Sequence, residues 1–112
     1  MLTYKAPIAD IKFLFEDVFG YYQHYEKYPE FEEATPDLVD AIFQECAKFC
    51  ENELLPMNQS ADKEGCTFDN GKVTTPKGFK EAYKQYVDGG WQSLSHGVEY
   101  GGQGLPPSLG MV

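Results

Sequence analysis

Apolar residues at helical spacing mark the first predicted element, a helix from Asp10 to Gly20. Asp10 suits the position before a first helical turn, and Gly20 can end the helix. One side of this helix is expected to be buried, because its apolar residues follow the i, i+3, i+4, i+7, i+8 pattern: Ile11, Leu14, Phe15, Val18 and Phe19. Residues 21–31 predict an irregular connector of packed aromatic rings that Pro29 interrupts.

The longest predicted helix runs from Thr35 to about Leu55. Thr35 is a favourable N-cap, Pro36 suits the first helical position, and Pro56 is expected to end the helix. A helix of about 20 residues spans roughly 30 Å and would be the spine of the fold. The side predicted to be buried carries Leu38, Ile42, Cys46, Phe49, Cys50 and Leu54.

A turn-rich stretch over residues 57–75 and a third helix are predicted next. Asn70-Gly71 is the pair favoured in a tight β-hairpin turn, so short strands are expected on either side of it. The third helix would be capped by Thr75, carry Pro76 in its first turn and end at Gly89 and Gly90. Residues 91–95 can form one further turn.

A glycine-rich loop over residues 99–106 is the most distinctive feature of the chain. Its glycines permit positive φ angles and close approach to a neighbouring surface. Pro107 and Ser108 then resemble the opening of a helix that the chain does not finish. We therefore expect this chain to be the front of something larger.

The length, composition and pattern together predict a mostly α fold, a small array of about three main helices with one short β-hairpin turn. Nothing in the composition marks a domain boundary within residues 1–112. The hydrophobic fraction of 42% is sufficient for a core. A net charge of −9 disfavours nucleic acid and anionic membranes as partners.

The sequence contains no apolar stretch that predicts a membrane span and no apolar signal-peptide core. Its cysteines, Cys46, Cys50 and Cys66, are an odd and sparse set, which favours reduced thiols. A cytoplasmic location is therefore expected.

Two glycine and acid patterns resemble ligand loops but fail in detail. A dinucleotide-binding loop would need a third glycine where the chain has Pro107, and a preceding strand. The acids around Gly65 and Gly71 lack the order of a calcium loop and are interpreted as solvated turn residues.

Cysteine and histidine chemistry is also possible but not favoured. Cys46 and Cys50 are one helical turn apart, yet neither His24 nor His96 stands at helical spacing to complete a metal site, so no metal is expected. His96 could act as a general base if Ser93, Ser95 and Glu99 converged on it. A partly buried, hydrogen-bonded loop histidine is the commoner case. Trp91 is interpreted as a packing anchor.

The ordered set of motifs resembles the amino-terminal region of the flavin-dependent acyl-CoA dehydrogenase family, in the branch with an amino-terminal extension that includes 3-methylmercaptopropionyl-CoA dehydrogenases. The matching stretches cover essentially the whole chain. They are Tyr4-Lys5-Ala6-Pro7 with Asp10 and Phe13, Leu55-Pro56-Met57-Asn58 with Asp62 and Gly65, Val73 with Pro76-Lys77-Gly78-Phe79-Lys80-Glu81-Ala82-Tyr83, Gly89-Gly90-Trp91, and Glu99-Tyr100-Gly101-Gly102-Gln103-Gly104-Leu105-Pro106.

The resemblance implies oxidation of an acyl-CoA thioester to the 2,3-enoyl thioester. In the family a glutamate removes the α-proton, the β-hydrogen passes as hydride to FAD, and electrons leave through an electron-transfer flavoprotein. The family has an amino-terminal helical domain, a middle β-domain that contacts the flavin, and a carboxy-terminal helical domain that supplies the glutamate. No residue here matches the base or flavin motifs, so no catalytic or cofactor-binding residue is assigned.

The resemblance further implies that this chain is the extension and part of the amino-terminal domain, with the middle and carboxy-terminal domains absent. Such a fragment is expected to be inactive, to bind no FAD and to self-associate through uncovered apolar faces, whereas the whole enzyme would be a homo-oligomer. By position, the residues nearest the substrate would be Tyr100, Gly101, Gly102, Gly104 and Leu105. The alternative is a stand-alone acidic helical interaction module without catalysis.

Overall fold

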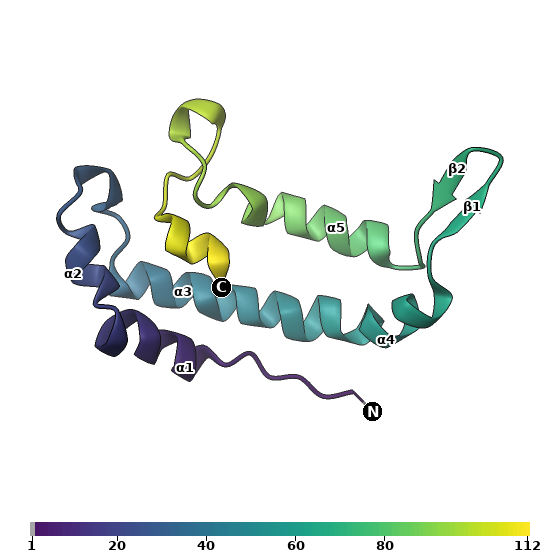
Figure 1. Ribbon diagram of the computed structural model, residues 1–112, viewed down its shortest axis with the longest axis horizontal. Coiled ribbons are helices and arrows are strands. Elements are labelled where there is room, and N and C mark those ends of the chain that lie inside the picture. The colour runs from purple at the N-terminus through teal and green to yellow at the C-terminus, as the bar shows by residue number, and fades with distance from the viewer. Residues whose placement is uncertain (1) are drawn as a thin grey trace.

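Helix α3 (Pro36–Phe49) is the spine to which the other elements attach in the computed structural model, which describes residues 2–112 (Figure 1). Its start is the predicted one. The Thr35 hydroxyl accepts a hydrogen bond from the Leu38 N–H at 3.3 Å, and Pro36 occupies the first turn. The cap supplies an acceptor that the free N–H groups of the first turn require.

The spine continues past Pro56, so the prediction that this proline ends the helix is wrong. A π-helical turn (Cys50–Leu54) follows α3 and leads directly into α4 (Leu55–Glu64). In the π turn the Leu55 N–H bonds to the Cys50 carbonyl, five residues back. The wider turn makes room for a proline ring that would otherwise collide with the preceding turn. Residues 57–64, predicted as turns, are therefore helical.

Helix α1 (Ile8–Phe13) begins after Pro7 rather than at Asp10, which lies in its first turn. A π-helical turn (Leu14–Val18) extends it, and Gly20 ends it at φ 59°, as predicted. Lys12 lies 3.0 Å from Asp40 and so ties α1 to α3. Each charge favours the other's ionised form, which raises the pKa of Lys12 and lowers that of Asp40.

The predicted connector is only partly irregular, because it contains helix α2 (Tyr21–Tyr25) and a 3-10 turn (Pro29–Phe31). Its rings do pack on one another, as predicted. Tyr21 meets Phe15 edge to face at 4.9 Å between ring centroids, and Tyr25 meets Phe31 at 6.1 Å. Burial raises the pKa of both Tyr22 and Tyr25.

The buried stripe of α3 is displaced by about one residue from the predicted one. Val39, Phe43 and Ala47 are buried, whereas Leu38 is exposed. The remaining predicted positions are half-buried: Ile42, Cys46, Phe49, Cys50 and Leu54. Apolar residues cover a wide sector of this helix, and the neighbouring elements cover only one side of that sector.

The predicted hairpin is confirmed. Strands β1 (Thr67–Asp69) and β2 (Lys72–Thr74) pair antiparallel, with Phe68 opposite Val73. The turn residues Asn70 and Gly71 have φ angles of 47° and 77°, which is the geometry that favours Asn-Gly. The hairpin projects from the end of the molecule where α4 and α5 approach each other (Figure 1).

Helix α5 (Phe79–Asp88) starts later than predicted, because Gly78 at φ 86° precedes it and Thr75 caps nothing. The Lys77 N–H instead bonds to the Glu64 carboxylate at 3.2 Å, which joins the end of α4 to the approach to α5. Gly89 and Gly90 end α5 as predicted, and a 3-10 turn (Trp91–Ser93) follows. Phe49, the last residue of α3, stacks against Trp91 at 6.5 Å, which places the turn after α5 beside the end of α3.

The chain ends in two further 3-10 turns (Val98–Tyr100 and Pro107–Met111). The second begins at Pro107, where the sequence predicts the opening of a helix, and Leu109 within it is buried. Ser108 bonds to the Tyr25 hydroxyl, so the end of the chain rests on the aromatic cluster. The mostly α architecture with one small hairpin is confirmed.

The molecule is flat and open, with extents of 54 × 37 × 18 Å and a radius of gyration of 17.1 Å. A compact domain of this length would have a radius of gyration of about 13 Å. Large apolar side chains are correspondingly exposed on several elements, including Phe13, Phe68, Tyr83 and Val98. Within residues 2–112 no helix combines the length and apolarity needed to cross a bilayer.

Candidate functional site

The glycine-rich loop is held at its base by main-chain hydrogen bonds to the segment that precedes it. Three of them, at 2.9 to 3.0 Å, join Gln103, Gly104 and Leu105 to the carbonyls of Ser93, His96 and Leu94 respectively. The Gln103 side chain also donates to the Gly90 carbonyl at 3.1 Å. These bonds close residues 93–105 into a compact loop. Its base is held by hydrogen bonds, and its tip is exposed to solvent.

The predicted need for glycine in this loop is confirmed at particular positions. Gly101 and Gly104 have φ angles of 83° and 67°. At Gly102 the reason is close approach, because a Cβ there would lie 2.1 Å from the His96 carbonyl oxygen. A side chain at Gly102 would therefore push the two sides of the loop apart.

The structure brings the predicted substrate-facing residues into one loop but gives them different surroundings. Tyr100 is 86% exposed at the tip, and Gly101 is exposed beside it. Gly102 and Gly104 are half-buried in the base. Leu105 is buried in the core with Leu94 and Leu109. Tyr100 is thus the side chain of this set that the loop presents outward, and Leu105 is its anchor.

His96 lies outside the arrangement that nucleophilic catalysis requires. Its side chain is exposed, which corrects the expectation of a partly buried, hydrogen-bonded histidine. The Ser93 hydroxyl donates to the Gly90 carbonyl at 3.0 Å instead of approaching an imidazole. The Glu99 carboxylate folds back against Gly97. A serine-histidine-carboxylate reading of these residues is therefore unsupported.

An apolar cavity of about 270 Å³ lies between the amino-terminal segment, the half-buried side of α3, and Trp91 and Leu109. The half-buried apolar residues of α3 and of the π turn that follows it all line the cavity: Ile42, Cys46, Phe49, Cys50 and Leu54. No lysine lines it, so it offers no cationic partner for the pyrophosphate of a flavin dinucleotide, and its residues do not fit FAD. Sequence reasoning missed this cavity, because the residues that line it were assigned to a closed core.

Cys46 and Cys50 face this cavity together. Burial, with the neighbouring Cys50, raises the pKa of the Cys46 thiol to about 11, so the thiol is protonated at neutral pH. Cys66 lies elsewhere and is exposed. In residues 2–112 no group of three His, Cys, Asp or Glu side chains is arranged to hold a metal ion.

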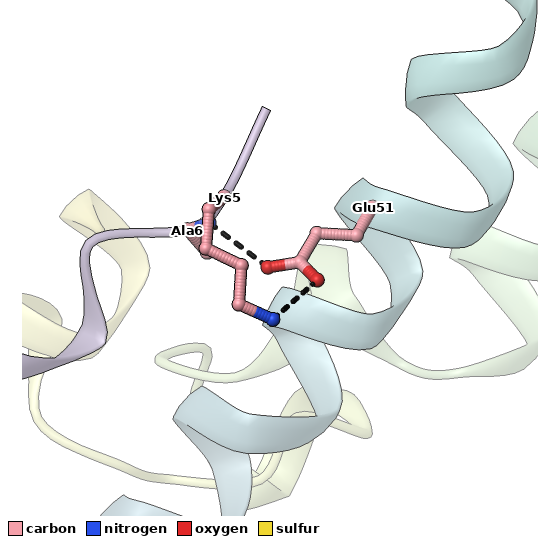
Figure 2. Close-up of polar contacts among 3 residues, drawn as sticks. All are labelled: Lys5, Ala6 and Glu51. Atoms are coloured by element: carbon pink, nitrogen blue, oxygen red, sulfur yellow. Dashed lines mark hydrogen bonds and ion pairs between the residues drawn. The ribbon is translucent and has the colours of Figure 1, made fainter. Parts of the chain in front are cut away.

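Glu51, in the π turn, makes a polar contact that sequence reasoning also missed (Figure 2). One carboxylate oxygen accepts the Ala6 N–H at 2.9 Å, and the other lies 2.9 Å from the Lys5 ammonium. The Ala6 N–H and then Lys5 lower the pKa of Glu51. The sequence gives no signal for this contact, because Glu51 is one of three polar residues between the stripe positions Cys50 and Leu54.

Comparison with characterised proteins supplies the context for these features. The chain is 41% identical over 109 residues, 97% of its length, to 3-methylmercaptopropionyl-CoA dehydrogenase of Ruegeria pomeroyi. It is 39% identical over 57 residues, 48% of its length, to butyryl-CoA dehydrogenase of Syntrophomonas wolfei. The matched region is 18% of the length of the Ruegeria protein and 9% of the length of the Syntrophomonas protein. The chain therefore spans only a small part of either relative. No protein-family model matches the chain.

Proposed function

We propose, from the sequence relationship to acyl-CoA dehydrogenases that the motifs predict and the comparisons confirm, that this chain forms the amino-terminal wall of such an enzyme. The observation that carries the proposal is identity of 41% along 97% of the chain. Similarity of this extent is not confined to one motif, and it includes the whole region from the amino-terminal segment to the glycine loop.

The reaction of the whole protein would be the 2,3-dehydrogenation of an acyl-CoA thioester. FAD would accept the hydride when bound, and an electron-transfer flavoprotein would receive the electrons. Because no residue of the chain matches the family's flavin or base motifs, both groups would come from other parts of the protein. The chain on its own is then inactive, and its contribution to the reaction is to shape the site and exclude water.

The open shape supports a role as one wall of a larger assembly. A radius of gyration of 17.1 Å and exposed side chains such as Phe68, Tyr83 and Val98 leave much apolar surface without cover. Exposed apolar surface of this kind is typical of interfaces. A stand-alone interaction module would be expected to carry polar residues at these positions, so the shape favours the enzyme fragment.

The loop at Tyr100 is the part that we assign to the substrate side of this wall, together with Gly101, Gly102, Gly104 and Leu105. Tyr100 reaches outward from a base that main-chain hydrogen bonds fix. The Gly102 contact with His96 sets the shape of that base. A rigid base with one projecting ring is suited to contact a bound thioester without contributing a charged group.

A chimeric enzyme tests the proposal directly. The region of the Ruegeria dehydrogenase that aligns with this chain is replaced by the chain, and FAD content and acyl-CoA-dependent dye reduction are measured. We expect a flavin-loaded, active chimera, and no dye reduction by the isolated chain incubated with FAD. A chimera that folds and binds FAD but does not oxidise acyl-CoA would contradict the proposed role, as would stoichiometric FAD binding by the chain alone.

The Tyr100 assignment has its own test in the same chimera. Tyr100→Ala is expected to raise KM for acyl-CoA several-fold with little change in kcat, because the ring would contribute binding rather than chemistry. Phe68→Ala is the control, since Phe68 is an exposed ring on strand β1 of the hairpin, outside the loop. Equal kinetics for the Tyr100→Ala and unsubstituted chimeras would remove Tyr100 from the substrate side.

A further inference from the structure

The amino-terminal segment covers one side of the apolar cavity. Residues 2–7 have no regular secondary structure and run alongside the spine, from near α4 to the start of α1 (Figure 1). Tyr4, Ala6 and Pro7 line the cavity on this side, whereas Cys46 lines it from α3 and Cys50 from the π turn. A second hollow lies farther along the same segment, between Leu2, Tyr4 and the residues around Leu54. We call residues 2–7 the strap.

The strap joins helix α1 at a sharp turn about Pro7. Pro7 has φ −80° and ψ 58°, and the Ile8 N–H bonds to the Ala6 carbonyl at 2.8 Å, which is an inverse γ-turn. Beyond this turn α1 is held in place, because Ile8 and Ile11 pack against the core and Lys12 pairs with Asp40 of α3. The strap can therefore change direction at Pro7 without disturbing the helix that follows.

Polar attachment of the strap depends on one side chain. In residues 2–112 the side-chain hydrogen bonds that hold the strap to the rest of the molecule both end on Glu51, from the Ala6 N–H and from Lys5 (Figure 2). The Glu51 side chain is 19% exposed, whereas that of Lys5 is 86% exposed. The shielded Ala6 bond is expected to contribute more than the solvent-exposed ion pair.

We propose that the strap is a hinged cover of the apolar cavity, that Glu51 is the latch that holds it closed, and that its release opens Cys46 and Cys50 to small thiol-reactive molecules. The apolar contacts of Tyr4 and Pro7 favour the closed position of the strap, but they do not fix where the strap lies along the spine. The Glu51 carboxylate binds at one point of the strap and so sets the closed position. This inference does not depend on the activity of the longer protein.

Thiol labelling of the 112-residue chain tests the latch, with N-ethylmaleimide as the probe and peptide mass spectrometry as the readout. Exposed Cys66 is the internal reference for reagent reactivity. Glu51→Ala is expected to label Cys46 and Cys50 about tenfold faster relative to Cys66, since a hydrogen bond to a carboxylate is lost. Lys5→Met, which keeps the Ala6 bond, is expected to change the rate less than about threefold.

Glu45→Ala is the matched control, because it removes the same charge from the same continuous spine, in α3 rather than the π turn, and Glu45 pairs with Lys48. Its labelling rates should equal those of the unsubstituted chain. A loss of general stability is separated from a lost latch by deletion of residues 2–6, which removes both groups that bond to Glu51, the Lys5 ammonium and the Ala6 N–H. If the latch acts through the strap, the deletion accelerates labelling and adding Glu51→Ala to it changes nothing further.

The proposal is overturned if Glu51→Ala and Glu45→Ala label at the same rate, or if Glu51→Ala still accelerates labelling in the chain without residues 2–6. Exchange of the Ala6 amide proton supplies the direct measurement of the bond. It should be slower in the unsubstituted chain than in Glu51→Ala by a factor similar to the labelling ratio. Equal exchange in the two proteins would show that the bond does not hold the strap.

Discussion

The two ends of the molecule differ in what covers their apolar side chains. One end contains α1, α2, the amino-terminal half of α3 and the glycine loop, and nearly all buried residues lie there, with Phe15, Tyr25, Val39 and Phe43 at its centre. The other end, α4, the hairpin and α5, buries only Pro76 and Ala82 among residues 55–88. We call these ends the core and the arm.

The comparison indicates that the core can hold its shape by its own packing and that the arm depends on neighbours. Helix α5 is amphipathic, yet Phe79 and Tyr83 on it remain exposed. The arm is tied back by a few polar contacts, such as Gln85 to Glu53 at 3.0 Å, and by Phe49 beside Tyr86. Polar contacts that are exposed contribute little to stability, so the arm is the part expected to gain most from a larger protein.

Truncating a core aromatic should have the largest effect. Phe43 is 2% exposed and meets Phe15 edge to face at 5.1 Å. Phe43→Ala is expected to lower the free energy of unfolding by about 3–5 kcal/mol. Phe68→Ala in the hairpin, where the ring is 74% exposed, should change it by less than about 0.5 kcal/mol. Urea denaturation followed by circular dichroism measures both, and equal effects would remove the distinction between core and arm.

Two glycine substitutions, one in the loop and one in the hairpin, compare how closely the core and the arm are packed. Gly102→Ala in the loop should cost about 1–3 kcal/mol, because the new methyl group would collide with the His96 carbonyl. Gly71→Ala in the hairpin meets no atom within 4 Å, and only its φ of 77° opposes it, at a cost of about 1 kcal/mol. The thermal midpoints of the two variants give the order. A Gly102→Ala variant as stable as the unsubstituted chain would mean that the loop base is not close-packed.

Pro56→Ala tests the junction between core and arm. Because the π turn already accommodates the ring, the substitution should leave the helical circular dichroism signal unchanged and alter stability by less than about 1 kcal/mol. If the helix instead ended at Pro56, as the sequence predicts, alanine at this position would allow the helix to continue. The helical circular dichroism signal would then rise. Asn52→Ala, at an exposed position of the same π turn, is the control for perturbation of that turn.

The smallest expected effect is that of acid on the latch. The pKa of Glu51 is lowered from its ordinary value of 4.5, so its contribution is present above that value and is lost as the pH falls through the lower folded-state pKa. The Ala6 amide chemical shift should therefore titrate with a midpoint below 4.5 and become insensitive to this step in Glu51→Gln. A midpoint at or above 4.5 would contradict the contact.

Local signals in the sequence account for much of the fold. Thr35 with Pro36 marks the start of α3, Asn70-Gly71 marks the hairpin, and Gly20 ends the first helix, because each residue type satisfies a backbone requirement at its own position. The glycines of the loop are predicted for the same reason. These features depend on few neighbours, so a single sequence reveals them.

Features that depend on packing were predicted less well. Pro56 reads as a helix end because no local rule indicates a π turn just before it. The Thr75-Pro76 pair reads as a helix start, yet the chain first bends to place the Lys77 N–H on Glu64. The α3 stripe was displaced because Val39 and Ile42 are equally apolar, and only the positions of other elements decide which is covered. The cavity and the Glu51 contact also depend on where the other elements lie against the spine, so the sequence did not reveal them.

Hydrogen exchange measured by mass spectrometry, on the chain alone and in the chimeric dehydrogenase, shows whether the arm needs a neighbouring part of the protein to become stable. We expect α3 to be similarly protected in both, and α5 and the hairpin to be weakly protected alone but strongly protected in the chimera. Arm segments that are as protected in the isolated chain as in the chimera would contradict the claim that their apolar surface requires a neighbour.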